Sequence, residues 1–129
     1  MAGTLLLLPI DRNEIEETRN ATDRLIRQYV AYMGRASAVG LCTCQVTGNS
    51  MGATLKHGDW LIIDALCHPA NGEVIVATLD GRYVVKRLLR DEHHTMLLSD
   101  NRDFPNIDVT PFRSFAVIGT VKAVVREVA

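Results

Sequence analysis

Hydrophobic and polar residues change their spacing part-way along the chain. Residues 11–34 repeat apolar side chains at helical intervals, with charged residues on the opposite side. From residue 41 onward, apolar residues alternate with polar ones or form short unbroken runs, which is typical of β-strands. The sequence therefore predicts a mainly β protein with one helical segment near its N-terminus.

The first segment, residues 1–36, is predicted to form a strand and a helix that pack on the main domain as an extension. The apolar run at residues 4–10 is typical of a buried strand, and Pro9 is expected to end it. Asp11 followed by Glu14 is typical of a helix start, because an acidic cap is followed three residues later by a second acid.

The helix leaves two alternatives open. Residues 19–22 are weakly apolar, so the segment could form two shorter helices, and Gly34 is a natural C-terminal cap for the second. An amphipathic helix usually packs on its own domain, and binding to a partner is the alternative.

The second segment, residues 37–129, is predicted to form one β-rich domain after a linker of small residues. Its strands are expected at residues 41–47, 60–64, 73–78, 82–89, 95–98 and 115–128. Asp80-Gly81 is typical of a hairpin turn, and residues 99–107 are expected to form a loop. The last strand is expected to be bent or divided in two, with a bulge at Gly119.

Composition narrows the classes of function. A chain of 129 residues is long enough for one domain, and its net charge of −1 gives no basic field to hold nucleic acid. DNA contact is therefore expected only through a domain outside this chain. The longest uncharged apolar run, Leu5–Ile10, is too short to span a bilayer and lacks the basic flank of a signal peptide, so no membrane association is expected.

Cys42, Cys44 and Cys67 are an odd set without a disulfide framework, which indicates reduced thiols and a cytoplasmic location. Their spacing, even with His68 included, does not match the wider pairs of structural zinc sites. No metal and no cofactor is predicted.

Two residues are candidates for chemistry. Ser50 lies on a bend after Gly48-Asn49, where the backbone N–H groups of Asn49 and Ser50 could hold an oxyanion. Lys86 lies inside an apolar strand, and burial would lower its pKa and favour the neutral amine that a general base needs. An exposed lysine and a serine that serves only the turn are the alternatives.

Six separated segments also follow one another in an order that matches a known family. They are Gly48-Asn49-Ser50-Met51, Gly58–Asp64, Gly72–Ala77, Val85–Leu88, Leu97–Ile107 and Val117–Val121. Together they resemble the LexA-like self-cleaving serine peptidases, a family that includes LexA, the UmuD mutagenesis proteins and the C-terminal domains of lambda-type phage repressors.

The resemblance implies a partly open β-barrel-like fold of the LexA and signal-peptidase type, with Ser50 as nucleophile and Lys86 as general base. It implies dimerisation through this domain, for which we expect the strand at residues 115–128 to pair with a second copy. It also implies a RecA filament as co-inducer. Two residues depart from the family pattern, which usually has Asp at the position of Asn49 and often Pro at that of Ala53. Neither position performs the chemistry, so we expect these differences to affect the conformation of the bend and not the mechanism.

Members of the family cut themselves at a bond between small residues, often Ala-Gly. Ala2-Gly3 is the only Ala-Gly pair in this chain. It is the candidate cleavage site, and the alternative is that it derives from cloning. The leading hypothesis is therefore the self-cleavage and dimerisation domain of a LexA-like SOS or phage repressor. A UmuD-like accessory subunit of a translesion polymerase and a non-catalytic dimerisation module are the alternatives.

Overall fold

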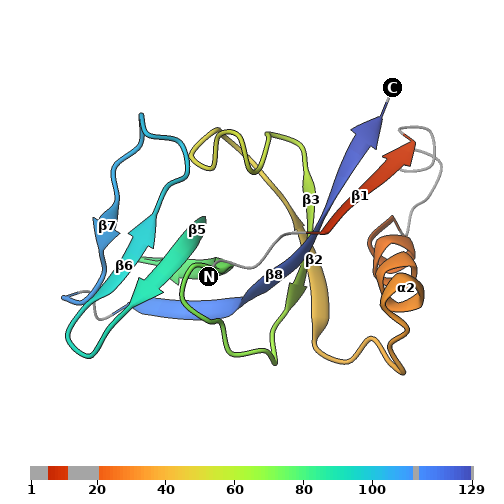
Figure 1. Ribbon diagram of the computed structural model, residues 1–129, viewed down its shortest axis with the longest axis horizontal. Helices are drawn as coiled ribbons and strands as arrows, with labels where there is room; N and C mark the ends of the chain where they lie inside the picture. The colour runs from red at the N-terminus through yellow and green to blue at the C-terminus, as the bar shows by residue number, and fades with distance from the viewer. Residues whose placement is uncertain (1–5, 12–20, 112–113, 129) are drawn as a thin grey trace.

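The computed structural model describes residues 6–11, 21–111 and 114–128, and these form eight strands and one helix (Figure 1). In chain order the elements are β1 (Leu6–Asp11), α2 (Ala21–Met33), β2 (Leu41–Gln45), β3 (Trp60–Asp64), β4 (Val74–Leu79), β5 (Arg82–Arg90), β6 (Thr95–Leu98), β7 (Ile107–Asp108) and β8 (Phe115–Val128). The strands pair in the order β2-β3-β8-β4-β5-β6-β7, and β1 pairs with β8 off this path. The sheet is not closed, as the partly open fold predicted.

The strand β8 holds the sheet together, since it crosses the molecule and pairs with β1, β3 and β4 (Figure 1). Thr120 pairs with both Asp64 of β3 and Ile75 of β4, so these strands lie on opposite edges of β8. Ala123 likewise pairs with Leu6 of β1 and Ile62 of β3. The strands β1 and β4 therefore share one edge of β8, and β3 occupies the other.

Two irregularities bend β8. The register against β4 skips Ile118, next to Gly119, and the register against β3 skips Lys122. A Cβ atom on Gly119 would lie 2.6 Å from Ile63 Cγ2, so the close approach of β3 requires glycine here. The bulge predicted at Gly119 is confirmed, and the last strand is one bent strand, not a pair.

The sheet buries both of its faces, so alternate residues of one strand enter different cores. One core contains Leu61, Ile63 and other apolar residues of β3, β4 and β8, together with Met51 and Leu55. On the opposite face Leu25 and Tyr29 of α2 pack against Ile62 and Val125. A third core lies where β4, β5 and β6 meet. The described part of the helix thus packs on its own sheet.

Most strand predictions hold to within two residues, and β3, β6 and β8 match in full. Pro9 does not end its strand: it lies inside β1, which continues to Asp11. Proline is tolerated there because β1 pairs with β8 alone among the described strands, so its other edge needs no N–H donor. Gly34, with a φ of +64°, follows the helix as the predicted cap, whereas the predicted helix start lies at and beyond the edge of the described residues.

Candidate active site

A turn between β2 and β3 carries Ser50. The hydrogen bonds from Val46 N to Asp59 O and from Gly58 N to Val46 O, both 2.8 Å, continue the hairpin to the base of this turn. Buried Met51 anchors the bend beside the half-buried Ser50, and Gly52 N closes the turn on Asn49 O at 3.0 Å. The serine is thus held on a bend fixed at both ends.

Lys86 lies on β5 with its side chain turned inward. As predicted from strand alternation, it shares a face with Val84 and Leu88, and its side chain is buried with 8% of the residue exposed. Burial lowers the pKa of Lys86 below its ordinary value of 10.5, since a charged ammonium loses hydration there. The exposed-lysine alternative is excluded by this burial.

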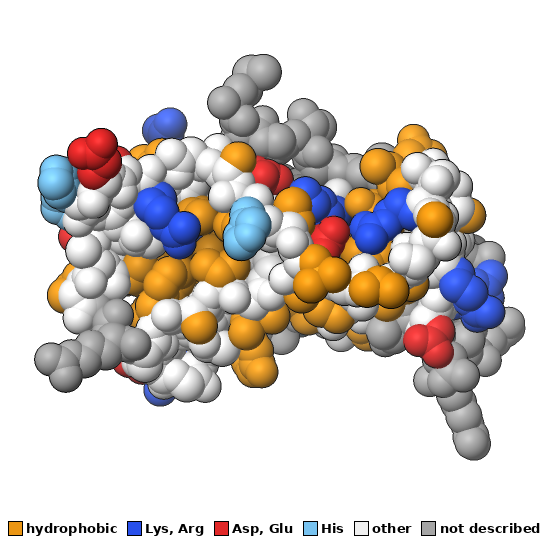
Figure 2. Space-filling view, turned by 90° about the horizontal axis from the view of Figure 1, so that it is seen from below, with side chains coloured by type: hydrophobic (Ala, Val, Ile, Leu, Met, Phe, Trp, Pro, Cys, Tyr) orange, Lys and Arg blue, Asp and Glu red, His pale blue; other side chains and the backbone are white. Residues whose placement is uncertain are grey.

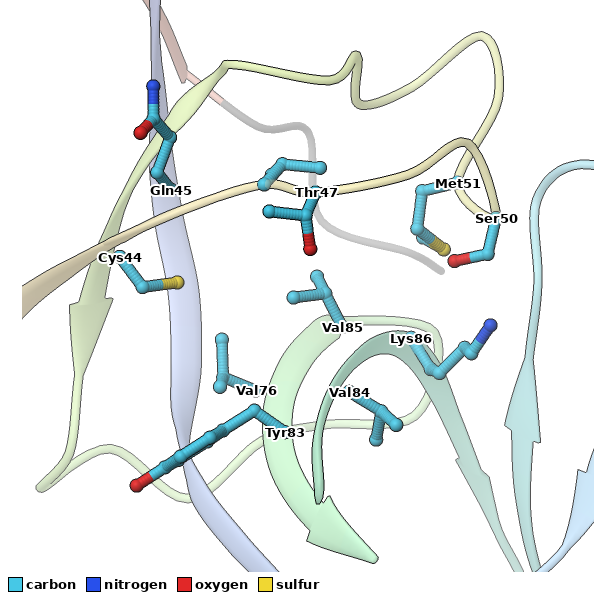
Figure 3. A pocket seen from close by; sticks show the side chains of 11 residues that line it. Cys44, Gln45, Thr47, Ser50, Met51, Val76, Tyr83, Val84, Val85 and Lys86 are labelled. Carbon is cyan, nitrogen blue, oxygen red and sulfur yellow. The ribbon is translucent and has the colours of Figure 1, made fainter.

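The two residues line one cavity of about 320 Å³. Figure 3 shows Ser50 and Lys86 at the same end of it, with the Lys86 amine extending toward the segment that carries Ser50. The rest of the wall is mostly apolar and includes Val76, Val84 and Val85. Such a wall fits a peptide segment with small apolar side chains.

Besides Ser50, the cavity wall contains three side chains with a thiol or hydroxyl group: Cys44, Thr47 and Tyr83. Burial, followed by the neighbouring Cys42, raises the pKa of Cys44 to about 11, so this thiol is protonated at neutral pH. Thr47 and Tyr83 are exposed at the cavity rim. Lys86 has its own partner: Nζ donates to Ser99 Oγ at 2.8 Å, and among the described residues no hydrogen bond joins it to Ser50.

Sequence reasoning missed Ser99 and treated it only as the start of a loop. The strand register contains the signal, because Leu98, the residue before Ser99, pairs with Arg87, the residue after Lys86. A correct alignment of β5 with β6 would have placed a hydroxyl beside the lysine.

Three consecutive residues of this loop connect β5 to the Ser50 turn. Ser99 accepts from Lys86, and Asp100 binds Arg87 through two hydrogen bonds of 2.9 and 2.7 Å. Asn101 donates from its backbone to Ser50 O at 3.0 Å and from Nδ2 to Asn49 O at 2.9 Å. The loop therefore sets the position of the serine relative to the lysine.

The backbone around the serine leaves donors available. Gly48 N–H donates to Nδ1 of His57 at 3.1 Å. The N–H groups of Asn49 and Ser50 donate to no acceptor within residues 6–11, 21–111 and 114–128. They are the groups that the sequence singled out for an oxyanion.

The remaining sequence predictions concern other parts of the chain. Ala2 and Gly3 lie outside the described residues. Asp59 Oδ2 accepts a hydrogen bond from Lys56 N at 2.8 Å and so fixes the turn before β3. Within the described chain no three His, Cys, Asp or Glu side chains are grouped to hold a metal, and no described helix has the length and apolar character to cross a membrane.

Comparison with known proteins identifies the family of this chain. A family model described as Peptidase S24-like matches residues 12–122. The chain belongs to the Peptidase S24-like family. This assignment agrees with the resemblance seen in the sequence and with the open, mostly β fold.

Curated relatives of this Peptidase S24-like chain carry the name LexA repressor. It is 36% identical to the LexA repressor of Delftia acidovorans over 83 residues, which is 64% of this chain and 37% of that protein. It is 35% identical to that of Magnetococcus marinus over 94 residues, or 71% of this chain and 41% of that protein. It is 35% identical to the LexA repressor of Streptomyces coelicolor over 89 residues, which is 68% of this chain and 37% of that protein. The match thus spans about two fifths of the length of these relatives.

Proposed function

We propose that this chain is the self-cleavage domain of a LexA-like repressor, with Ser50 as nucleophile and Lys86 as general base. The observation that carries the proposal is the shared cavity, in which Ser50 and a buried lysine with a lowered pKa lie at one end. The repressor relatives favour this function over a translesion polymerase subunit. The buried lysine favours it over a non-catalytic module, since a buried amine is costly unless it has a use.

The reaction proceeds as an acyl transfer. The lone pair of neutral Lys86 Nζ takes the Ser50 Oγ proton while Oγ attacks the carbonyl carbon of the scissile bond. The resulting oxyanion accepts from the Asn49 and Ser50 N–H groups. Lys86 then gives the proton to the leaving amine, and water hydrolyses the ester on Ser50.

The open edge of β5 provides a place for the substrate peptide. Residues 82–87 pair with β4 on one edge, but β6 pairs only from Arg87 onward. The other edge of residues 82–86 therefore has no strand among the described residues, and Tyr83, Val84, Val85 and Lys86 line the cavity there. An extended peptide can add to such an edge through backbone hydrogen bonds.

We further propose Ala2-Gly3 as the bond that is cut. Leu6 pairs with Ala123 on the edge of β8 that also pairs with β4. Three residues earlier in β8, Thr120 pairs with Ile75 of β4, and Ile75 in turn pairs with Lys86 of β5. Strand spacings place Leu6 about 11 Å from Lys86. Three or four extended residues span about 10 to 13 Å, so the chain preceding Leu6 is long enough to reach the cavity.

Dimerisation, DNA binding and RecA response belong to the same proposal. Residues 123–125 of β8 have strands on both edges, so a second copy can pair with β8 only elsewhere, and we favour residues 115–119, where Ile118 is exposed. On the face in Figure 2, Lys and Arg side chains are interspersed with hydrophobic and acidic ones. The whole chain has a net charge of −1, so we assign DNA binding to a part of the protein outside these residues, and a RecA filament is the proposed co-inducer.

Incubation of the chain, extended by an N-terminal tag, between pH 7 and 10 tests the proposal. Intact mass spectrometry should detect a product that begins at Gly3, formed faster at higher pH at a rate independent of protein concentration. Ser50→Ala and Lys86→Ala should each stop cleavage, whereas Ser114→Ala and Lys56→Ala, changed at exposed sites, should not. Cleavage that persists in Ser50→Ala, or its absence from the unchanged protein, overturns the proposed function.

A further inference from the structure

The hydroxyl group of Ser99 lies between Lys86 and a backbone carbonyl. Lys86 Nζ and Ser99 Oγ are 2.8 Å apart, and Ser99 Oγ donates to Pro105 O at 3.3 Å. A carbonyl oxygen can only accept, so the single proton of Ser99 is committed to Pro105. Toward Lys86 the Ser99 oxygen must therefore act as the acceptor, and one N–H of the amine is fixed in that direction.

An aromatic ring lies near the amine. Lys86 Nζ lies over the ring of Phe104, 5.8 Å from its centre. The face of an aromatic ring carries negative charge density and attracts an N–H group. A neutral amine has two N–H groups and one lone pair in staggered positions. With one N–H directed at Ser99, the second N–H and the lone pair share the two remaining positions, and the lone pair can take the one on the cavity side, where Ser50 lies.

The loop that carries Ser99 is itself held firmly. Ser99 N donates to Asn106 Oδ1 at 3.1 Å, and Asp100 is paired with Arg87 at 2.7 Å. Because Arg87 and Asp100 neutralise one another, the nearest charges on β5 and on the loop add little net field at the amine. The orientation of Lys86 then depends on the Ser99 hydroxyl more than on distant charges.

We propose that Ser99 is a positioning residue that orients the Lys86 amine so that its lone pair faces Ser50. The inference rests on the proposed function but adds a residue to it. Ser99 Oγ touches no reacting atom; it acts only through Lys86. A competing assignment, in which Lys86 activates Ser99 as the nucleophile, conflicts with the bond from Ser99 to Pro105 and with its absence from the cavity wall.

The first test follows the rate of self-cleavage against pH in Ser99→Ala and Ser99→Thr. Without the acceptor the amine rotates freely, so Ser99→Ala should lower the rate plateau about tenfold, within the range of a mispositioned base. Its inflection should move to lower pH, because the hydroxyl also stabilises the ammonium form. Ser99→Thr keeps the hydroxyl and should stay within about threefold of the unchanged protein. Ser114→Ala, which removes an exposed hydroxyl bonded to Asp80, is the matched control.

The second test does not depend on cleavage. In Ser50→Ala protein, the Lys86 Cε resonance is titrated by NMR with Ser99 present and with Ser99→Ala. The pKa of Lys86 should fall when Ser99 is removed and return with Ser99→Thr. Ser99→Val, which has the shape of threonine without its hydroxyl, should give the same fall, and it replaces Ser99→Ala if that variant does not fold.

Each outcome decides the question. The role of Ser99 is overturned if the Lys86 pKa or the pH profile of cleavage is unchanged in Ser99→Ala. It is also overturned if Ser99→Ala cleaves slowly and Ser99→Thr does not restore the rate. Cleavage that survives Ser50→Ala but not Ser99→Ala overturns it too, and makes Ser99 the nucleophile. If the unchanged protein never cleaves, the proposed function fails, while the titration still decides whether Ser99 orients Lys86.

Discussion

Arg126 binds both carboxylate oxygens of Asp59, with distances of 2.9 Å from Nε to Oδ1 and 2.8 Å from Nη2 to Oδ2. Asp59 is 2% exposed and also accepts from Lys56 N. Burial by itself would raise the pKa of Asp59, but the bonds from Arg126 and Lys56 hold it below its ordinary value. This pair joins the start of β3 to the end of β8, behind the turn that carries Ser50.

Asp59→Asn should therefore lower the free energy of unfolding by about 2 kcal/mol near pH 7, which is less than for a fully buried pair because Arg126 is partly exposed. A carboxyl group with a lowered pKa in the folded protein stabilises it above the unfolded value near 3.8 and loses this effect as the pH falls. The difference between Asp59→Asn and the unchanged protein should thus shrink below about pH 4. Urea denaturation across pH measures it.

Asp91→Asn is the matched control, because Asp91 accepts from the backbone N–H groups of His93 and His94, which an amide oxygen can also satisfy, and its 3.8 Å contact with His94 Nδ1 is exposed to solvent. It should change stability by less than about 0.5 kcal/mol. Equal losses in both variants would show that the Arg126 pair contributes nothing specific.

Asn101→Ala should slow self-cleavage about tenfold while lowering stability by only about 1 kcal/mol. It removes the bond from Nδ2 to Asn49 O but keeps the backbone bond to Ser50 O. The turn would thus stay folded with the serine less well placed. The rate of appearance of the Gly3 product and the melting temperature measure the two effects.

Asn71 offers a control of the same residue type, since its side chain bonds the backbone of Arg90 at 2.8 and 2.7 Å, away from the cavity wall. Asn71→Ala should lose comparable stability and retain the full rate of cleavage. A similar loss of rate in both variants would attribute the effect to general loosening.

Lys86→Met should stabilise the protein at pH 7. Because burial lowers the pKa of Lys86, there is a pH range below 10.5 in which the unfolded chain still holds a proton that the folded protein has lost. The free energy of unfolding rises with pH through that range, so Lys86 destabilises the folded protein most at pH values below the range. The gain from methionine should be about 1.4 kcal/mol for each unit by which the pKa is lowered, and should vanish above about pH 10.5.

Lys122→Met tests the sign of this argument. Burial lowers the pKa of Lys122, but Cys67 and Glu73 outweigh it and raise the pKa overall. Lys122 therefore stabilises the folded protein below 10.5 and loses this effect as the pH rises through the folded value. Thermal melts of the two variants should show opposite signs at pH 7; the same sign in both would contradict the assignment.

Local pattern was enough to predict most strands and to single out Ser50 and Lys86 as candidates, whereas the roles assigned to them rested on the family resemblance. Alternation along β5 placed Lys86 on one face with Val84 and Leu88 but left open whether that face was buried, and Gly48-Asn49 placed Ser50 on a bend. These features depend on neighbours within a few positions in the chain, which a single sequence records.

The remaining contacts join residues distant in sequence, and no local pattern encodes them. Arg126 meets Asp59 across 67 positions, and Asn101 meets Asn49 across 52. The pairing of β1 with β8 in parallel was also not predicted, and it explains why Pro9 can lie inside a strand. The contact between Ser99 and Lys86 depends on the alignment of β5 with β6, which hydrophobic alternation alone does not fix.

The place of β8 in the order of synthesis has a consequence for when the chemistry can begin. The strands β1, β3 and β4 all pair with β8, which comes last among the described strands, so the complete sheet forms only once residues 115–128 have been made. Until residues 115–128 emerge, β3 and β4 expose unpaired edges, and within the described part of the chain the hairpin that carries Ser50 is hydrogen-bonded to the strand of Lys86 only through the loop at residues 99–101. We therefore expect self-cleavage to begin only after residues 115–128 have been made and paired.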